Sequence, residues 1–249
     1  MRATMKALKA GSPVTEATCK NYDLSSAVMP MVSGLPGPSD GLKPYHVVLG
    51  RGVQNYTCAS ATATPTPKGA VATLYNISCA AAMDSTDRNN LTASMVPAAY
   101  EYPESSSGPL PQFNNPMFNI SGHHYFSDDK TPTFNLVMKQ TGPPPTNAEI
   151  PLSNYGIYFA NVSSKAVAAP TLGDESTSRA GEAAVQWLKL SVTSPAPAPY
   201  KVMVEDQKSA KEIFRVNTVG GNANAGDCAN HADGKQFSVP YAAEYWFWG

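Results

Sequence analysis

The stretch Val71-Ala72-Thr73-Leu74-Tyr75-Asn76-Ile77 alternates large and small side chains with a period of two. Successive side chains of a strand point to opposite faces, so this pattern predicts a β-strand with one buried face. The run from His46 to Cys58 is rich in β-branched and aromatic residues, and its Gly50 and Gly52 indicate a bulge or bend in a second strand. We expect these two runs to pair as a β-hairpin.

Similar short segments, separated by Pro-rich turns, follow along the chain. Further strands are expected at residues 125–126, 134–140, 156–162, 185–192, 213–219 and 237–248. The best helix candidate covers residues 84–100, and we expect Pro97 to end it. About nine short strands around one core predict an all-β fold, either a β-sandwich or a Greek-key β-barrel. Long Pro/Gly-rich loops and at most one or two short helices complete this expectation.

The N-terminal region differs in composition from the rest of the chain. Residues 1–43 are rich in Pro, Gly and Ser, and the run from Leu35 to Pro38 is incompatible with regular structure. We expect an irregular arm packed on a single β domain at residues 44–249, because all-β domains of this size are common. The first eleven residues lack the apolar run of a signal peptide, so we expect the given start to be a mature or trimmed form.

Charge and hydropathy exclude several classes of protein. The formal net charge is −1 and charged residues make up 15% of the chain, against about 25% in average soluble proteins. Acidic and basic residues are scattered, which disfavours nucleic-acid binding. No stretch approaches the roughly 18 consecutive apolar residues of a membrane-spanning helix, so we expect no membrane span.

The cysteines indicate an oxidising compartment. Cys19, Cys58, Cys79 and Cys228 are even in number and lack the close spacing of a zinc site. Two disulfides are the favoured interpretation, and four buried thiols in a cytosolic protein are the alternative. In the expected hairpin, Cys58 lies near the turn and Cys79 near the open end, which argues against pairing them. We therefore predict Cys19–Cys79 and Cys58–Cys228.

Five Asn-x-Ser/Thr triplets are potential N-glycosylation acceptors. They begin at Asn55, Asn76, Asn90, Asn119 and Asn161. Asn90, Asn119 and Asn161 lie in or beside expected loops and are the predicted glycan sites, whereas the other two lie in expected strands. Glycans would compensate for the low surface charge. Together with the disulfides, they predict a secreted, extracellular glycoprotein.

Four segments occur in a combination typical of one family. They are residues 49–58, 69–75, 122–126, and 214–221 leading to 239–247. These segments resemble the domain-of-unknown-function family numbered 3455, found chiefly in secreted fungal proteins and in some bacteria. The resemblance covers nearly the whole chain beyond the arm and implies an extracellular fungal-type protein, without an established activity. Some relatives carry a malate dehydrogenase label. Gly220-Gly221 lacks the third glycine and the βαβ setting of a dinucleotide site, so we expect no NAD-dependent dehydrogenase.

His123-His124, followed by Asp128, is the best candidate for a metal or catalytic site. On a strand, adjacent side chains point to opposite faces, so a second ligand must come from elsewhere, such as His46 or His231. We favour the alternative in which one histidine is buried and the other exposed. No metal and no other cofactor is therefore expected.

Glu244 lies within an aromatic and apolar segment near the C-terminus. Burial would raise the pKa of its carboxyl group and suit it to act as an acid, with Asp128 among the other candidate carboxylates. The alternative is a structural ion pair with Arg51 or Arg215. We favour the ion pair.

The aromatic residues around Glu244 are candidates for ligand binding. They are Tyr241, Tyr245, Trp246 and Trp248. Alternation places the two tryptophans on one face, and an exposed row of rings would stack on sugars. A strand covered on both faces is the alternative. The leading hypothesis is thus a non-enzymatic surface or ligand-binding protein whose expected ligand is cell-wall or host carbohydrate. The alternatives are an extracellular metal-assisted or acid/base hydrolase, or a purely structural wall protein.

Overall fold

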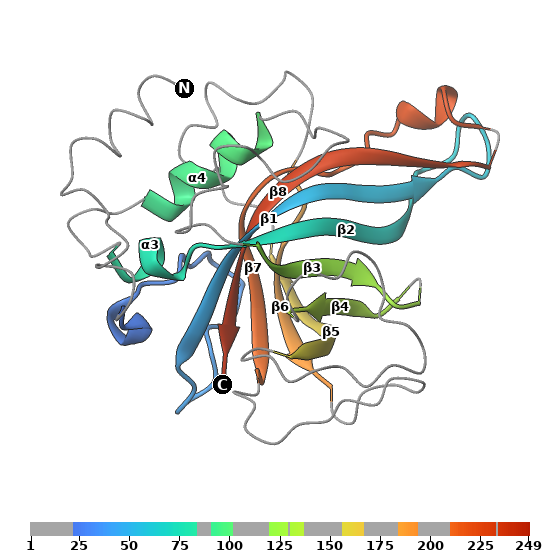
Figure 1. The fold of residues 1–249 in the computed structure, drawn as a ribbon. Coiled ribbons are helices and arrows are strands. Elements are labelled where there is room, and N and C mark those ends of the chain that lie inside the picture. The colour runs from blue at the N-terminus through green and yellow to red at the C-terminus, as the bar shows by residue number, and fades with distance from the viewer. Residues whose placement is uncertain are drawn as a thin grey trace.

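The computed structural model describes residues 22–83, 91–101, 120–128, 130–136, 156–166, 184–193, 210–232 and 234–249. Its eight antiparallel strands form one closed barrel (Figure 1). The strands are β1 (Pro44–Thr57), β2 (Thr66–Asn76), β3 (Ile120–Phe126), β4 (Pro132–Asn135), β5 (Ile157–Ala166), β6 (Trp187–Val192), β7 (Glu212–Gly220) and β8 (Gln236–Trp248). The helices are η1 (Leu24–Ser26), α3 (Ser78–Met83), α4 (Leu91–Tyr100) and η4 (Asp227–Ala229).

The barrel confirms the all-β expectation. Each strand pairs with the next one along the chain, and β8 closes the barrel on β1. This sequential order is that of an up-and-down barrel, so the sandwich and the Greek-key connection are not the forms adopted. Consecutive antiparallel strands need no long crossover, which favours this order. No helix in the described ranges is both long and apolar enough to cross a membrane.

Strand β1 forms the expected hairpin with β2 and also pairs with β8 over almost its whole length. It is not broken at its glycines, because the register shift against β2 falls between Asn55 and Tyr56. Gly50 and Gly52 instead allow neighbouring residues to pack closely against β1. A Cβ atom on Gly52 would lie 1.9 Å from the carbonyl oxygen of Val71, and one on Gly50 would lie 2.7 Å from the ring of Tyr245. Each of the eight runs named from the sequence overlaps one of the eight strands, one fewer than the rough count of nine.

The alternation of side chains along the strands produces two apolar clusters. Residues pointing into the barrel form the inner cluster, which includes Val48, Leu74, Phe134, Leu190, Tyr245 and Phe247. Residues pointing outward from β1, β6, β7 and β8 form the outer cluster together with residues of the helices and the arm, and it includes Leu49, Val96, Trp187, Phe214 and Trp246. Full burial of one such side chain contributes about 1.5–3 kcal/mol. From Tyr241 to Phe247, both faces of β8 are therefore core.

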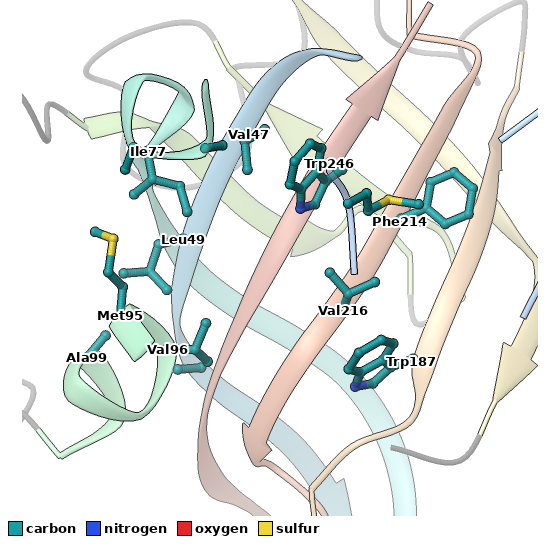
Figure 2. Packing of buried hydrophobic residues seen from close by; sticks show 14 of the residues in the cluster. Val47, Leu49, Ile77, Met95, Val96, Ala99, Trp187, Phe214, Val216 and Trp246 are labelled. Carbon is teal, nitrogen blue, oxygen red and sulfur yellow. The ribbon is translucent and has the colours of Figure 1, made fainter. Parts of the chain in front are cut away.

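Helix α4 covers the outer face of β7 and β8 (Figure 1). In Figure 2, its Met95 and Val96 lie beside Leu49 of β1. Pro97 lies inside this helix, which continues to Tyr100, so the expected stop at Pro97 is wrong. An interior proline removes one backbone hydrogen bond and costs about 3 kcal/mol. Burial of one face of α4 against the barrel offsets that cost.

The described part of the N-terminal arm also packs on the outer face. Leu24, Met29 and Leu35 are buried within the outer cluster. Farther along the arm, the backbone N–H and hydroxyl of Ser39 donate to the carboxylate of Glu212, at 3.0 and 2.6 Å. That carboxylate also lies 3.0 Å from the ammonium of Lys189. The arm is thus fastened to β6 and β7 by charged as well as apolar contacts.

Candidate functional site

A disulfide joins the end of β1 to η4 at one extremity of the structure. The Sγ atoms of Cys58 and Cys228 are 2.02 Å apart, across 170 residues of sequence, which confirms this predicted pairing. Cys79 is also disulfide-bonded. Cys19 lies outside the described residues, so the pairing of Cys19 with Cys79 stays a prediction. The disulfide is compatible with an oxidising compartment.

The adjacent histidines of β3 point to opposite sides of the barrel wall. His124 is buried inside, where its Nδ1 lies 2.9 Å from the carbonyl oxygen of Thr133. Its ring stacks on Phe134 at 4.3 Å between centroids. Burial is the main cause that lowers the pKa of His124 to about 4. His123 is half-buried, and burial lowers its pKa as well. The pair cannot therefore chelate one ion through both rings.

His46 is buried between two serine hydroxyls. Its Nε2 lies 3.0 Å from Oγ of Ser121, and its Nδ1 lies 3.1 Å from Oγ of Ser78. The hydroxyl of Ser78 also accepts a hydrogen bond from the backbone N–H of Val47 at 2.9 Å. Burial lowers the pKa of His46 to about 3, so the imidazole is neutral and has one N–H donor and one acceptor for the two hydroxyls. The arrangement links β1, β3 and α3.

The candidate metal ligands do not gather into one site. Within the described ranges, no three His, Cys, Asp or Glu side chains lie close enough together to hold an ion. His231 stacks on Phe237 at 4.3 Å. Asp128 is exposed and its Oδ1 accepts from the backbone N–H groups of Lys130 and Thr131, at 3.0 and 2.6 Å. The pKa of Asp128 is lowered, first by hydrogen bonding with the side chain of Thr131 and next by the backbone N–H of Lys130. Asp128 thus shapes the turn between β3 and β4.

Glu244 is fully buried on the outer face of β8, beneath α4. Its Oε2 accepts from Nδ2 of Asn217 at 2.6 Å, and its Oε1 accepts from Nε1 of Trp246 at 2.9 Å. Asn217 lies at a bulge of β7 with a φ of 46°, a left-handed conformation that Asn tolerates better than most residues. Both carboxylate oxygens therefore accept hydrogen bonds, and the bond from Asn217 holds the bulge of β7 against β8.

The two arginines considered as ion-pair partners of Glu244 occupy different faces. Arg215 shares the inner face with its cross-strand neighbour Tyr245, so it points away from Glu244. Arg51 lies on the outer face, and its guanidinium donates to the carbonyl oxygens of Ala99, Gly52, Tyr241 and Tyr100. Arg51 thus fastens the end of α4 to the barrel. The hydrogen bonds of Asn217 and Trp246 replace the expected pair with Arg215.

We expect Glu244→Gln to lower the free energy of unfolding by about 1–3 kcal/mol. Glutamine keeps one acceptor oxygen, but its NH₂ group would face the N–H of either Asn217 or Trp246. Denaturant unfolding measures the loss. The matched control is Glu101→Gln, at an exposed residue beyond α4, for which the change should stay within about 0.5 kcal/mol. A Glu244→Gln variant as stable as the parent protein would contradict the structural role.

The aromatic row of β8 is core rather than surface. Tyr241, Tyr245 and Trp246 are each no more than 1% exposed, and Trp248 is partly buried. The first three rings therefore cannot stack on a sugar at the surface, because both faces of β8 are covered. The two tyrosine hydroxyls meet inside the barrel at 3.1 Å. Any ligand that reaches them must enter the barrel.

The potential glycan sites differ in their placement. Asn161 is exposed, but it lies within β5 rather than in a loop. Asn90 and Asn119 lie outside the described residues. Asn55 is half-buried on β1 and its Oδ1 accepts from the hydroxyl of Ser238 at 2.7 Å. Asn76 caps α3 by accepting from the backbone N–H of Ser78 at 2.9 Å.

Sequence reasoning missed a partly polar group of residues on the inner face of the barrel. We call it the Gln54 mouth, and it consists of Gln54, Val185, Arg215, Gly221, Tyr241 and Tyr245. A Cβ atom on Gly221 would lie 2.7 Å from Cβ of Tyr241, 3.0 Å from Cγ1 of Val185 and 3.2 Å from Cγ of Gln54. The absence of a side chain at Gly221 lets the other three converge. Alternation along β1 places Gln54 on the inner face, and this signal could have revealed it.

Gln54 and Arg215 contribute an amide and a positive charge to the Gln54 mouth. Gln54 is 8% exposed, and its Nε2 has no hydrogen-bond partner among the described residues. Arg215 donates through Nε and Nη2 to the carbonyl oxygen of Gln186, at 3.1 and 2.9 Å. It also forms a hydrogen bond with the hydroxyl of Tyr245. The mouth thus combines a buried amide, a cation and two hydroxyls within an apolar barrel.

The fold defines the class of protein as a closed up-and-down β-barrel whose outer face is partly covered by helices and the N-terminal arm. Residues 38–249 match the model of a family described as a protein of unknown function, DUF3455. The chain therefore belongs to this family, in agreement with the resemblance of its motifs. Comparisons with curated proteins and with solved structures gave no match.

Proposed function

We propose that this chain is a secreted, non-enzymatic extracellular protein that binds a small ligand at the Gln54 mouth. Eight-stranded barrels have an interior that is either filled by side chains or able to hold one small ligand. Barrel mouths are also common positions for ligand sites. The disulfide between Cys58 and Cys228 suits an oxidising compartment, and exposed Asn161 offers a position for a glycan.

The unpartnered amide of Gln54 is the observation that carries the proposal. A buried donor without an acceptor costs about 1–3 kcal/mol, whereas an apolar side chain of similar size at this position would avoid that cost. The neighbouring inner-face residues of β1 and β2 are indeed small or apolar: Gly52, Ala70 and Ala72. A ligand acceptor beside Nε2 would satisfy the amide. Binding therefore gives a reason for glutamine at this position.

The other candidate functions have less support. Surface binding of cell-wall or host carbohydrate relied on exposed rings, and Tyr241, Tyr245 and Trp246 are buried. A hydrolase that uses Glu244 as an acid would need that carboxyl group to reach a substrate. Its two oxygens are instead engaged by Asn217 and Trp246 in the core. A sugar that enters the mouth remains one form of the proposed ligand and is included in the test.

The test combines Gln54→Leu with a panel of small molecules. We expect Gln54→Leu to raise the free energy of unfolding without ligand by about 1 kcal/mol, because it removes the unpartnered amide. Thermal unfolding is then recorded with glucose, N-acetylglucosamine, benzoate, 4-hydroxybenzoate and octanoate. At least one compound should raise the Tm of the parent protein, and the same compound should have little effect on Gln54→Leu.

The control variant is Gln236→Leu, which makes the same substitution at an exposed residue of β8. It should respond to the panel as the parent protein does. Loss of stability in Gln54→Leu would show that the amide is satisfied within the fold and would remove the reason for a ligand. A panel without any effect on the parent protein would also refute binding at the mouth.

A further inference from the structure

We propose that the ligand of the Gln54 mouth is a small organic anion, a carboxylate attached to an apolar body. This inference rests on the proposed function and specifies the chemistry of the same site. It follows from a juxtaposition inside the barrel, where a guanidinium, a buried amide and a tyrosine pair present hydrogen-bond donors that lack acceptors.

The two tyrosine hydroxyls carry two protons, but the hydrogen bond between them needs only one. The hydroxyls of Tyr241 and Tyr245 are 3.1 Å apart, and one of them donates to the other. Burial is the largest cause that raises the pKa of both side chains, so each hydroxyl keeps its proton. Arg215, the other partner of Tyr245, has donors only. One hydroxyl proton of the pair therefore has no acceptor among the described residues.

Gln54 adds donors of the same kind. Its Nε2 carries two N–H groups, and neither has a partner in the described ranges. Strand register places Gln54 one inner-face position beyond Gly52, which is the cross-strand partner of Tyr241. The buried groups without a partner among the described residues, Nε2 of Gln54 and one hydroxyl of the tyrosine pair, are thus donors. An acceptor-only group such as a carboxylate complements them, whereas a sugar hydroxyl would bring further donors.

Arg215 supplies the charge. Its cross-strand neighbours Tyr245 of β8 and Leu188 of β6 both belong to the inner cluster, so the arginine side chain extends along the inner face. It has no carboxylate partner among the described residues, and its contacts are one carbonyl and one hydroxyl. The guanidinium has five N–H donors in a planar fork that suits bidentate contact with a carboxylate. Arg215 is partly exposed and its contacts with Gln186 lie at the surface, so the guanidinium attracts an anion from the solvent-facing side of the apolar interior.

The apolar side chains of the inner cluster indicate the chemistry of the rest of the ligand. Beyond the polar groups of the mouth, the interior presents aromatic and aliphatic side chains, among them Leu74, Phe134 and Tyr158. A hydrated inorganic anion would lose its water there without gaining apolar contacts. A carboxylate with an aromatic or alkyl body satisfies both parts of the site.

The test measures the Kd of the full chain by calorimetry for 4-hydroxybenzoate, octanoate and benzoate. Neutral 4-hydroxybenzyl alcohol and inorganic phosphate serve as comparison probes. We expect at least one carboxylate to bind, with both comparison probes at least tenfold weaker. Arg215→Met should weaken carboxylate binding at least tenfold and leave the weak binding of the alcohol unchanged. Arg215→Lys keeps the charge and should retain part of the affinity even if Arg215→Met folds poorly.

Lys211→Met is the matched control, because Lys211 is exposed and immediately precedes β7. It removes the same charge at an exposed residue four positions before Arg215 and should leave the Kd unchanged. If glucose or N-acetylglucosamine raises the Tm while no carboxylate binds, the proposed function stands and the anion is refuted. Equal loss of affinity in Arg215→Met and Lys211→Met, or phosphate bound as tightly as the carboxylates, would also overturn the inference.

Discussion

Lowering the pH from 7 to 5 is expected to reduce the free energy of unfolding by about 4 kcal/mol, because two buried histidines cannot take up protons without cost. The pKa values of His46 and His124 are lowered to about 3 and about 4 in the folded protein. Both rise to an ordinary value of about 6.5 on unfolding. Between these values the unfolded chain binds more protons, so stability decreases as the pH falls.

The histidines and the carboxylates affect the free energy of unfolding in different pH ranges. Glu212 has a lowered pKa, with hydrogen bonds from Ser39 and Lys189 opposing the effect of burial. A carboxylate of this kind stabilises the fold above its unfolded pKa, and its contribution is lost only below about pH 4.5. The decrease between pH 7 and pH 5 therefore belongs to the histidines. His123, whose pKa is also lowered, adds a smaller effect of the same sign because it is partly exposed.

Denaturant unfolding at half-unit pH intervals measures this dependence. We expect His124→Gln, which cannot take up a proton, to be less stable at pH 7 but to lose about half of the pH dependence between pH 7 and 5. His46→Gln should remove a similar share. Stability that stays constant between pH 7 and 5 in the parent protein would show that the two imidazoles are not held neutral as the structure places them.

The alternation of side chains along short stretches of the sequence predicted much of the architecture. The period-two alternation from Val71 to Ile77 predicted a strand, and its pairing with the strand that contains Gly52 is confirmed by the β1–β2 hairpin. The same alternation separated Tyr245 from Trp246. It could not show that both faces are covered, because α4 and the arm come from distant parts of the sequence. The choice between barrel and sandwich likewise depends on β8 pairing with β1, which is a non-local contact.

Alternation along β1 could place Gln54 on the inner face, but its convergence with the rest of the Gln54 mouth was beyond sequence reasoning for a related reason. Gln54 and Arg215 lie 161 residues apart in the sequence, and they face the same space only because the barrel closes. Each residue alone is compatible with an exposed strand position. From the sequence, Arg215 is one of two arginines, with Arg51, that could form an ion pair with Glu244. Cross-strand register, which a single sequence does not reveal, places it beside Tyr245 instead.

Replacing Cys58 and Cys228 together by alanine is expected to lower the free energy of unfolding by about 5 kcal/mol, by the chain-entropy relation for a loop of this length. The disulfide spans 170 residues, so its loss greatly increases the freedom of the unfolded chain. In the folded protein, the surrounding stack of Tyr56, Phe237 and His231 should keep the region ordered. The expected loss therefore arises mainly from the unfolded state.

Denaturant unfolding of Cys58→Ala/Cys228→Ala, compared with the parent protein, measures this loss. Ser60→Ala, at an exposed residue just after Cys58, is the control for a change of side chain in the same turn region and should stay within about 0.5 kcal/mol. Near-unchanged CD spectra would show that the folded barrel survives without the bond. A loss below about 1 kcal/mol would mean that the unfolded chain stays compact without this link, since the entropic effect requires freely separating ends.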